Sequence, residues 1–329
     1  MADNNANIYG RFHDQLIDRA CDTLLITENE LIYSFADIER TTARLARFMT
    51  ELGVKPGDRV SVQVEKTPQA LCLYLACLRA GFVFHPLNTA YRADELSYFL
   101  GNAEPSLVVC DSAKQDEIAI LAQAEGVAHL LTLNADGSGT LMEQSLATPE
   151  EFNIVQREQD DLAALLYSSG TTGVPKGIML THRNLLANAE ALVNAWGFRA
   201  EDRLLHALPI FHVHGLFVAL GCVLLSGASM RWLPGFNAKK VIRFLPECTV
   251  MMGVPTYYTR LLDTAEFNRE SCANMRLFIS GSAPLLEDTF YQFEQRTGHR
   301  ILERYGMTET NMNSSNPLHG ERKPGTVGL

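Results

Sequence analysis

The stretch LAALLYSSGTTGVPKG, residues 162–177, decides the fold class of this sequence. Its first half is an apolar run that predicts a buried strand, and glycines at 170, 173 and 177 let the backbone bend sharply after it. A helical pattern, NLLANAEALVNAW, follows the loop. A strand, a loop and a helix in this order are typical of proteins built on a parallel sheet, so the stretch predicts an α/β fold.

The same alternation of strands and helices extends along the chain in both directions. Towards the N-terminus, the pattern predicts helices over residues 35–53, 69–81 and 116–126, a strand after the turn at 56–58 and a buried strand over 106–110. Towards the C-terminus, it predicts a buried helix within 215–230, strands at 249–254 and 275–280, and a helix that starts at Pro255. A polar, acidic stretch at 147–161 separates the two halves. We therefore expect two stacked α/β subdomains, residues 1–157 and 158–329.

Composition excludes several classes of protein. The 329 residues are 47% apolar and 20% charged, which is ordinary for a globular protein with a large core. The net charge of −10 disfavours a nucleic-acid binder, because such proteins usually present a basic surface. There is no signal-peptide pattern, no apolar stretch suited to a membrane span, and the seven cysteines are scattered. We expect a cytoplasmic protein with reduced cysteines and no membrane or nucleic-acid partner.

The loop at 168–177 has the composition of a phosphate-binding loop. Hydroxyl groups of Ser168, Ser169, Thr171 and Thr172 and the backbone amides freed by Gly170 and Gly173 are donors for phosphate oxygens, and Lys176 adds a positive charge. The spacing is not that of a Walker A loop, since Pro175 precedes the lysine and no serine or threonine follows it. The residues alone leave open an ordinary connection between a strand and a helix.

Motifs in three other places extend this interpretation. YSSGTTGVPKG resembles the phosphate-loop signature of the adenylate-forming superfamily, which includes acyl-CoA synthetases, luciferases and peptide-synthetase adenylation domains. LPIFHVHGL at 208–216, GSAPL at 281–285 and ERYGMTET at 303–310 resemble further motifs of that superfamily in the same order. The resemblance covers the whole chain. It implies activation of a carboxylate by ATP and Mg²⁺ to an acyl-adenylate, followed by ligation to coenzyme A.

The resemblance also implies roles for individual residues. Thr308, Glu309 and His212 would be the catalytic residues, with Glu309 associated with Mg²⁺ and Thr308 bonded to the α-phosphate. Tyr305 would stack on adenine, Gly306 would leave room for the nucleotide, and Gly281, Ala283 and Pro284 would line the other side of the base. The nucleotide-binding set is completed by Ser168, Ser169, Gly170, Thr171, Thr172, Gly173, Lys176, Ser282, Glu303, Arg304 and Met307.

The histidines of HVH allow two interpretations. His212 and His214 share one face of an extended segment, with His206 nearby, but no cysteine or carboxylate stands beside them at the spacing of a metal site. By the resemblance, His212 borders the acyl pocket and gates its access to ATP. We expect His214 to contribute packing only.

The identity of the acid depends on GVPTYYTRLL, residues 253–262. Arg260 follows Tyr257 by almost one helical turn, so the two side chains share a face of the expected helix. A guanidinium directed at the acyl pocket would suit a second carboxylate, whereas an exposed arginine on the outer face is the alternative. Together with HALPIFHVHGLF and ERYGMTETNMN, the segment resembles malonyl-CoA synthetases. That resemblance implies a small dicarboxylate, malonate or methylmalonate, held by Arg260 and Ser282 and bordered by His212 and Met307, with Arg276 and Arg304 as further cationic candidates.

The sequence ends with GTVGL, shortly after the ERYGMTET motif. Members of the superfamily continue with a third subdomain, a TGD motif and a C-terminal domain that carries a catalytic lysine. We therefore expect these 329 residues alone to have little or no ligase activity and to retain weak ATP or AMP binding. Two alternatives remain: an adenylating enzyme for another short or aromatic carboxylate, and a non-catalytic nucleotide-binding module. The oligomeric state is not predicted.

Overall fold

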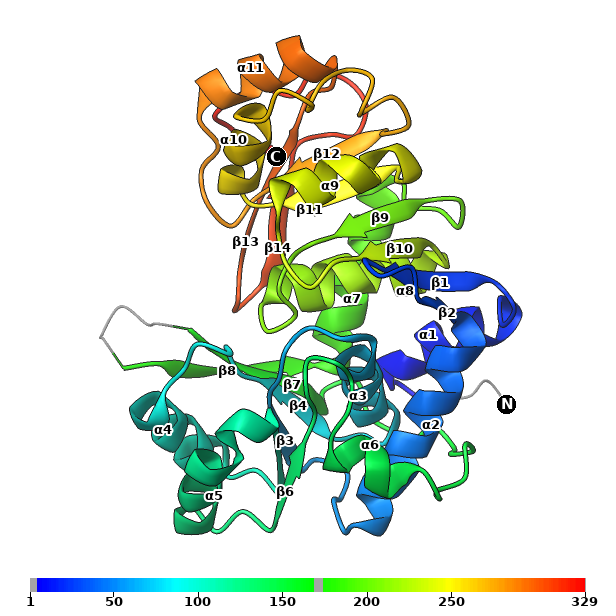
Figure 1. The fold of residues 1–329 in the computed structure, drawn as a ribbon, viewed down its shortest axis with the longest axis vertical. Helices are drawn as coiled ribbons and strands as arrows, with labels where there is room; N and C mark the ends of the chain where they lie inside the picture. Colours follow the sequence, from blue (N-terminus) through cyan, green and yellow to red (C-terminus); the bar gives the residue numbers. More distant parts are fainter. Residues whose placement is uncertain (1–4, 169–173, 329) are drawn as a thin grey trace. The chain divides into compact units, whose positions relative to one another are not determined.

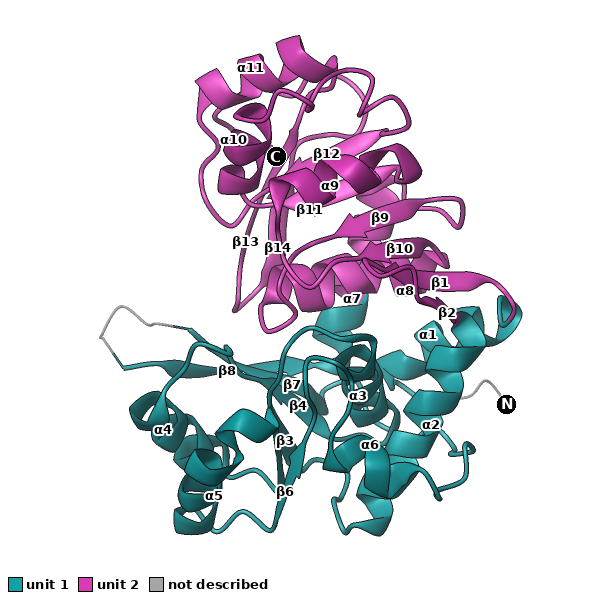
Figure 2. Ribbon diagram, in the orientation of Figure 1, with its two compact units in different colours: residues 1–20, 35–186 teal, residues 21–34, 187–329 magenta. Residues whose placement is uncertain are grey.

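The computed structural model describes residues 5–168 and 174–328. Two compact units divide the chain, the first made of residues 1–20 and 35–186 and the second of residues 21–34 and 187–329 (Figure 2). Each unit has its own mixed α/β architecture (Figure 1), as expected from the sequence. The chain passes from one unit to the other within helix α7, His182–Trp196.

The described part of the first unit contains a six-stranded sheet in the order β6-β5-β3-β4-β7-β8. All neighbouring pairs are parallel except β7 and β8, which form an antiparallel pair at one edge. The strands are β3 (Arg59–Gln63), β4 (Val83–Pro86), β5 (Leu107–Cys110), β6 (His129–Thr132), β7 (Leu162–Ser168) and β8 (Lys176–Thr181). The helices are α1 (Ile8–Asp18), α2 (Phe35–Glu51), α3 (Pro68–Arg79), α4 (Ala93–Ala103), η1 (Ser112–Lys114), α5 (Gln115–Ala124) and α6 (Thr140–Ser145).

Local sequence explains the central helix of this unit. The side chain of Thr67 accepts a hydrogen bond from the backbone N–H of Ala70, and Pro68 occupies the first turn, so α3 is capped at its start. Every residue from Ala70 to Arg79 is buried, which explains why the helix is apolar almost all round. Helices α1 and α2 pack against it, while α4 and α5 cover β5 through Phe99, Ile118 and their neighbours (Figure 1).

The described part of the second unit contains an eight-stranded sheet in the order β14-β13-β12-β11-β9-β10-β1-β2. Its inner strands are parallel, and antiparallel pairs form both ends. The strands are β1 (Thr23–Thr27), β2 (Ile32–Ser34), β9 (Arg203–His206), β10 (Ser229–Trp232), β11 (Val250–Gly253), β12 (Leu277–Ser280), β13 (Leu302–Met307) and β14 (Asn311–Ser315). The helices are η2 (a π-helical turn, His214–Ala219), α8 (Leu220–Ser226), α9 (Ala238–Phe244), η3 (Leu245–Glu247), α10 (Pro255–Leu262) and α11 (Glu287–Thr297).

The core of the second unit forms where α9, α10 and α11 pack on the sheet. Phe244 of α9, Tyr258 and Leu261 of α10 and Phe293 of α11 lie in one buried cluster with Phe278 of β12. The Tyr258 hydroxyl donates to the backbone oxygen of Ile279 at 2.6 Å, so its polar end is satisfied within the core. The packing fixes the ends of β11 and β12 from which the candidate site is built.

The units differ from the expected subdomains in two ways. The expected boundary lay between residues 157 and 158, but β7 pairs with β4 in the first sheet, and β8 pairs with β7. Strands β7 and β8 are therefore neighbours in the first sheet, and β8, not the expected helix, is the next described element after β7. Residues 21–34 cross to the second unit because β1 pairs in parallel with β10. Both differences come from strand pairing over long distances in the sequence.

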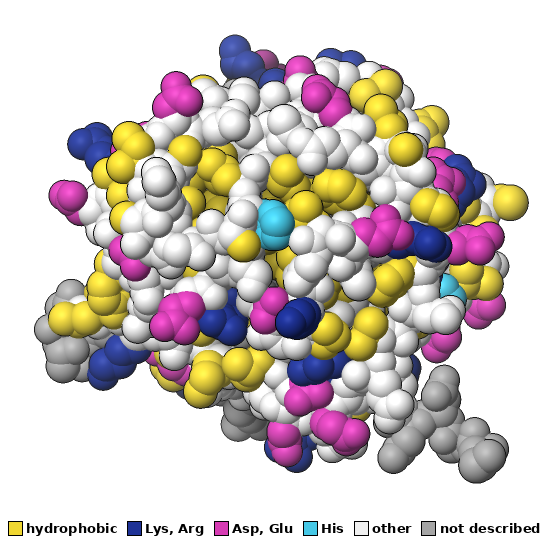
Figure 3. Space-filling view, turned by 90° about the horizontal axis from the view of Figure 1, so that it is seen from below, with side chains coloured by type: hydrophobic (Ala, Val, Ile, Leu, Met, Phe, Trp, Pro, Cys, Tyr) yellow, Lys and Arg dark blue, Asp and Glu magenta, His cyan; other side chains and the backbone are white. Residues whose placement is uncertain are grey.

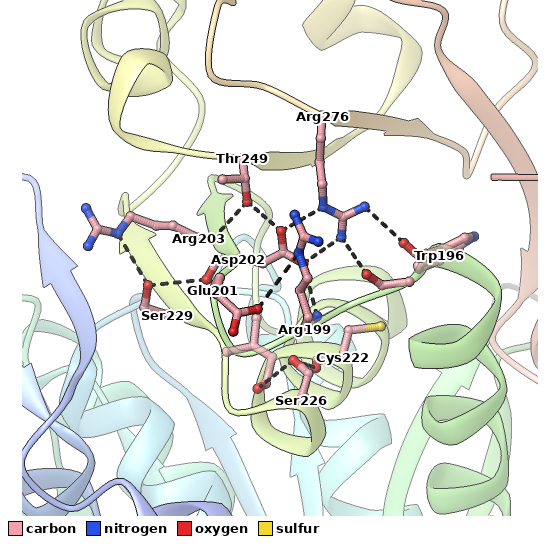
Figure 4. A network of polar contacts seen from close by, with 12 residues as sticks. Trp196, Arg199, Glu201, Asp202, Arg203, Cys222, Ser226, Ser229, Thr249 and Arg276 are labelled. Carbon is pink, nitrogen blue, oxygen red and sulfur yellow. Dashed lines mark hydrogen bonds and ion pairs between the residues drawn. The ribbon is translucent and has the colours of Figure 1, made fainter. Parts of the chain in front are cut away.

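A buried ion pair joins the residues that precede β9 and β12, and Thr249, which precedes β11, is hydrogen-bonded to it (Figure 4). Asp202, whose side chain is 1% exposed, accepts hydrogen bonds from Nε and Nη2 of Arg276 at 2.7 and 2.6 Å and from the Thr249 hydroxyl at 2.8 Å. The same guanidinium donates to the backbone oxygens of Trp196 and Gly197. These bonds lower the pKa of Asp202 against the opposing effect of its burial. The network connects the end of α7 with the starts of three strands, β9, β11 and β12.

The surface is consistent with the acidic composition. On the face shown in Figure 3, acidic and basic side chains are interspersed with apolar ones. Cys21 is exposed, and the other six cysteines are buried and unpaired.

No helix in the described part of the chain is long and apolar enough to cross a membrane.

Candidate functional site

A cavity of about 510 Å³ opens in the second unit at the carboxyl ends of its parallel strands. The volume lies within the range of about 300–1,000 Å³ that is usual for small-molecule sites. Segments that follow β9 and β11, together with the ends of β12 and β13, supply most of its wall. The lining residues are Leu208, Pro209, His212, Val213, His214, Gly215, Val254, Tyr257, Ser282, Arg304, Gly306, Met307, Thr308 and Met312.

Strand order explains why the cavity forms at this place. From β9 the chain runs to β10 on one side, and it then returns to place β11 on the other side of β9. The segments that leave β9 and β11 therefore diverge, and the crevice between them is where open parallel sheets bind ligands. His212 lies on the first segment and Tyr257 on the second. The topology thus makes this cavity the candidate ligand site of the second unit.

Arg304 is the charged residue of the cavity wall. It lies on β13, is 2% exposed and lines the cavity, and its Nε has no hydrogen-bond partner among the described residues. Its Nη2 donates to the Ser282 hydroxyl over a long distance of 3.5 Å. Burial lowers the pKa of Arg304 to about 10, so the side chain is still charged at neutral pH. Burying a cation without a counter-charge is costly, so the cavity wall at Arg304 is suited to an anion.

Gly281 and Ser282 contact the guanidinium of Arg304 and determine its position. A Cβ at Gly281 would lie 2.5 Å from Nε and Nη1 of Arg304, so any larger residue at 281 would require the guanidinium to move. Ser282 has a φ of 70°, a left-handed conformation that is rare for residues with a side chain. Such strain persists only where the surroundings enforce it, so the packing around this turn fixes the position of the Ser282 hydroxyl. Gly281 therefore makes room for the guanidinium of Arg304, and the sequence did not indicate this contact.

The three histidines near the cavity have different surroundings. His206 is buried, and its Nε2 lies 2.9 Å from the backbone oxygen of Gly215. His212 lines the cavity with an exposed ring, although partial desolvation lowers its pKa. His214 is buried, lines the cavity, and has its Nδ1 3.4 Å from the Ser282 hydroxyl. Burial, together with the charge of Arg304, holds the pKa of His214 well below its usual range, so the ring is neutral.

Among residues 5–168 and 174–328, no group of three or more histidine, cysteine, aspartate or glutamate side chains could hold a metal ion. His214 was expected to contribute packing only. Its position on the cavity wall is therefore a finding that sequence reasoning missed. The alternation of His212 and His214 along the chain was the available signal, but it did not say which ring would face a ligand.

The end of β13 and its turn carry the remaining predicted residues. Thr308 and Met307 line the cavity, while Tyr305 and Glu309 are exposed on the hairpin outside its wall. A Cβ at Gly306 would lie 3.0 Å from the backbone carbon of Asn311, so the hairpin itself requires glycine there. The structure thus explains Gly306 by the close approach of the two hairpin strands, whereas the sequence analysis explained it by the space needed for a nucleotide.

Several predicted residues lie away from the cavity wall. Ala283 and Pro284 are exposed beyond it, and Glu303 is buried, its carboxylate bonded to the backbone N–H groups of Leu285 and Gly325. Burial raises the pKa of Glu303. Its role in this structure is to hold the chain on either side of β13.

The two ends of the predicted phosphate-binding loop, Ser168 and Lys176, belong to the first unit. Ser168 ends β7 and the exposed Lys176 begins β8. The predicted residues Ser169, Gly170, Thr171, Thr172 and Gly173 lie outside the described residues.

The three candidate arginines differ in their exposure, in their partners and in whether they line the cavity. Arg260 is exposed on α10, with its guanidinium carbon 5.0 Å from the ring centre of Phe236, and it does not line the cavity. Phe236 stacks in turn on Tyr257 at 3.9 Å. Arg276, the second cationic candidate, is paired with Asp202 and does not line the cavity. Arg304 is thus the guanidinium that the structure places at the cavity.

The fold, the cavity at the strand ends and the sequence motifs define a class of enzyme. Residues 14–329 match the AMP-binding enzyme family, and the chain belongs to this family. The resemblance that was drawn from the motifs at 167–177, 281–285 and 303–310 is therefore confirmed at the level of the family.

Particular relatives are CoA ligases. The chain is 34% identical to the mitochondrial malonate–CoA ligase of Xenopus laevis over 90% of its own length and 54% of the relative's. It is 30% identical to the malonate–CoA ligase of Arabidopsis thaliana over 94% of its length and 57% of the relative's. The crystal structure of ATP-bound MatB from Rhodopseudomonas palustris shares 49% identity and a TM-score of 0.95, covering 98% of this chain and 64% of that one. The chain thus spans about half the length of these curated relatives.

Proposed function

We propose that the protein containing this sequence activates a small dicarboxylic acid, malonate or methylmalonate, with ATP and ligates it to coenzyme A. The observation that carries the proposal is a charged arginine, Arg304, in the wall of a cavity at the strand ends of an AMP-binding enzyme. An acid with an apolar chain would leave that charge without a partner, whereas a second carboxylate would pair with it. Identity to malonate–CoA ligases supports the same class of acid.

In this proposal, different residues bind the acid, the phosphate and the base. The cavity wall holds the acid so that one carboxylate faces the exposed turn that carries Thr308. Thr308 offers a hydroxyl donor to the phosphate under attack, and Tyr305 presents an exposed ring suited to stacking on a base. His212 stands at the cavity with a lowered pKa, so it is neutral at pH 7 and does not trap the attacking carboxylate as an ion pair. Transfer then depends on in-line placement of carboxylate and phosphorus.

The oxygen donors of the hairpin fit a magnesium ion. Glu309 is an exposed carboxylate beside Thr308 on the turn between β13 and β14, and Mg²⁺ prefers such hard oxygen ligands. We propose Glu309 as its protein ligand. When bound, the ion offsets the negative charge of the phosphate oxygens. The predicted roles of Lys176, Arg260 and the loop at 168–173 remain proposals that rest on the resemblance.

The cytoplasmic location also remains a proposal, supported by six buried and unpaired cysteines. One relative is described as mitochondrial, so the compartment needs a direct measurement by cell fractionation.

Exchange of radiolabelled pyrophosphate into ATP tests the proposed function. The product of the whole reading frame should catalyse exchange with malonate or methylmalonate and much less with acetate or octanoate. Arg260→Ala tests the residue that the resemblance assigns to the acid. Equal exchange with acetate and octanoate would overturn the dicarboxylate assignment and leave an adenylating enzyme for another acid. No exchange with any carboxylate would favour a nucleotide-binding module.

A further inference from the structure

The helix that follows β9 begins with a π-helical turn, and this turn lies at the cavity. The turn is η2, His214–Ala219, and it continues directly into α8. A π-helical turn bonds each residue to the fifth one along the chain, so it contains an extra residue relative to an α-helical turn, and it often occurs at functional sites. Four consecutive residues at the start of this segment line the cavity, namely His212, Val213, His214 and Gly215. The irregular winding therefore determines which side chains of the segment face the cavity.

His206 connects this turn to the sheet. It is the last residue of β9, is 1% exposed, and its Nε2 lies 2.9 Å from the backbone oxygen of Gly215. Because a carbonyl oxygen can only accept, Nε2 of His206 carries the proton and donates it. The hydrogen bond thus joins the end of a strand to the start of the π-helical turn, across the loop that supplies Leu208, Pro209 and His212 to the cavity wall.

The ring of His206 is held in turn by the neighbouring strand. Trp232 of β10 is the partner of His206 in the parallel register, and the centres of the two rings lie 4.9 Å apart. The backbone oxygen of His206 accepts a hydrogen bond from the N–H of Leu233 at 3.1 Å. Both rings are buried. The donor therefore projects from a fixed strand end, and its position is set before any ligand binds.

Gly215 shows how closely the loop approaches the turn. A Cβ at this position would overlap the backbone oxygen of Pro209 and would lie 3.1 Å from Cβ of Leu208. If the turn rewound to an α-helix, it would lose its extra residue, and the residues before it would rotate by about 100° around the helix axis. His212 and His214 would then leave their places on the cavity wall. The hydrogen bond from His206 opposes this change, because it holds the backbone oxygen of Gly215 at a fixed point.

We propose that His206 is a positioning residue of the cavity, and that its hydrogen bond to Gly215 holds the π-helical turn that places His212 and His214 at the wall. His206 itself does not line the cavity, so it acts through the turn. An effect on the acid rests on the proposed function, whereas the placement of the two histidines does not. The two effects are therefore measured separately.

Nuclear magnetic resonance of the histidine rings, with ¹³C-labelled histidine and no ligand, tests the placement in the 329-residue chain. The variants are His206→Leu, which removes the donor, and His206→Gln, whose amide N–H can reach the place of Nε2. His299→Leu is the matched control, since His299 also lies in the second unit with its Nε2 3.2 Å from a backbone oxygen, that of Cys272, and does not line the cavity. The signal of His212 is identified by its loss in His212→Gln.

The signal of His212 should respond to His206 alone. In the wild type it should titrate below the ordinary histidine pKa of about 6.5, because partial desolvation lowers the pKa of His212. His206→Leu should displace the signal and raise its titration midpoint, since the ring leaves the wall where it is desolvated. His206→Gln should give the wild-type signal, and His299→Leu should leave it unchanged.

Exchange of radiolabelled pyrophosphate into ATP, catalysed by the product of the whole reading frame, measures the consequence for the acid. His206→Leu should raise the KM for malonate by about 10-fold and change the KM for ATP by less than about twofold, because the turn lines the cavity proposed for the acid. His206→Gln should recover most of the loss, and His299→Leu should keep both constants. A merely structural role would lower the amount of active enzyme without separating the two KM values.

The possible failures are distinguishable. If neither His206 variant displaces the His212 signal, or if His299→Leu displaces it equally, His206 does not hold the turn. If His206→Leu does not fold, His206→Gln decides alone, since a wild-type signal supports the hydrogen bond and a displaced signal contradicts it. If the signal moves as expected and the KM for malonate stays unchanged, the turn does not position the acid. If the wild type shows no exchange with malonate, the proposed function is wrong, while the histidine signals still decide how the turn is held.

Discussion

Replacing Asp202 with alanine is expected to lower the free energy of unfolding by about 3 kcal/mol. The side chain is 1% exposed and accepts two hydrogen bonds from Arg276 and one from Thr249. Removing one member of a buried ion pair typically costs about 3–5 kcal/mol, because the remaining charge loses its partner. Arg276 is 22% exposed, so water can solvate it partly and the lower end of the range applies. The loss should also loosen β9 and β11, whose far ends carry the cavity.

The effect has a defined pH dependence. The pKa of Asp202 is lower in the folded protein than its ordinary value, chiefly because Arg276 and Thr249 bond its carboxylate against the effect of burial. A carboxyl with a lowered folded pKa stabilises the protein above its unfolded pKa of about 3.9, and this contribution disappears as the pH falls through the folded value. The difference in stability between wild type and Asp202→Asn should therefore be constant near neutral pH and shrink below about pH 4.

Urea unfolding followed by circular dichroism measures both effects. Glu201→Ala is the matched control, since Glu201 adjoins Asp202 in sequence but pairs with Arg199 only at the surface, 3.9 Å away. That control should change stability by less than about 0.5 kcal/mol. A double-mutant cycle with Arg276→Met should show coupling, because the two losses share one interaction. If Asp202→Ala costs no more than Glu201→Ala, the network does not support the fold as argued.

Three further predictions concern the site. Ser282→Gly should be about 1 kcal/mol more stable than Ser282→Ala, because glycine adopts a φ of 70° without strain; equal melting temperatures would show that the turn is relaxed. Gly306→Ala should destabilise by about 1–3 kcal/mol, since its Cβ meets the backbone of Asn311, and unchanged urea unfolding would contradict the close approach of the two hairpin strands. Glu309→Gln should weaken binding of Mg·ATP by about tenfold and leave metal-free ATP unaffected in thermal-shift titrations, and an equal loss for both would argue against magnesium binding.

The sequence predicted those features that depend on local pattern. The helices at 35–51, 68–79 and 255–262 lie close to the expected ranges, because their apolar spacing and capping residues act within a few turns. The pairing of β1 with β10 joins residues about 200 positions apart, and nothing in the composition of either strand identifies the other. The antiparallel pair of β7 and β8 was also not predicted. Strand β8 is short and leads directly into a helix, so its residues do not show a clear alternation of apolar and polar side chains.

Within the site, the family motifs located the right segments but did not decide which side chains meet. Helical spacing correctly placed Arg260 near Tyr257, yet the structure inserts Phe236 beside both. The sequence could not single out Arg304 among the cationic candidates. The residues that surround it belong to η2 and to the turn after β12, which are remote in sequence. Which of two arginines is buried depends on packing, and single-sequence patterns carry little information about packing.

The close fit between Gly281 and Arg304 has a consequence for enzyme redesign. The guanidinium occupies the volume that a Cβ at position 281 would need, so the two positions share one space. Shortening Arg304 alone, to accept acids with an apolar end, would leave a void beside the glycine. Enlarging Gly281 alone would displace the arginine. A change of acid preference therefore has to exchange both residues together, and natural enzymes with a larger residue at 281 should carry a smaller one at 304.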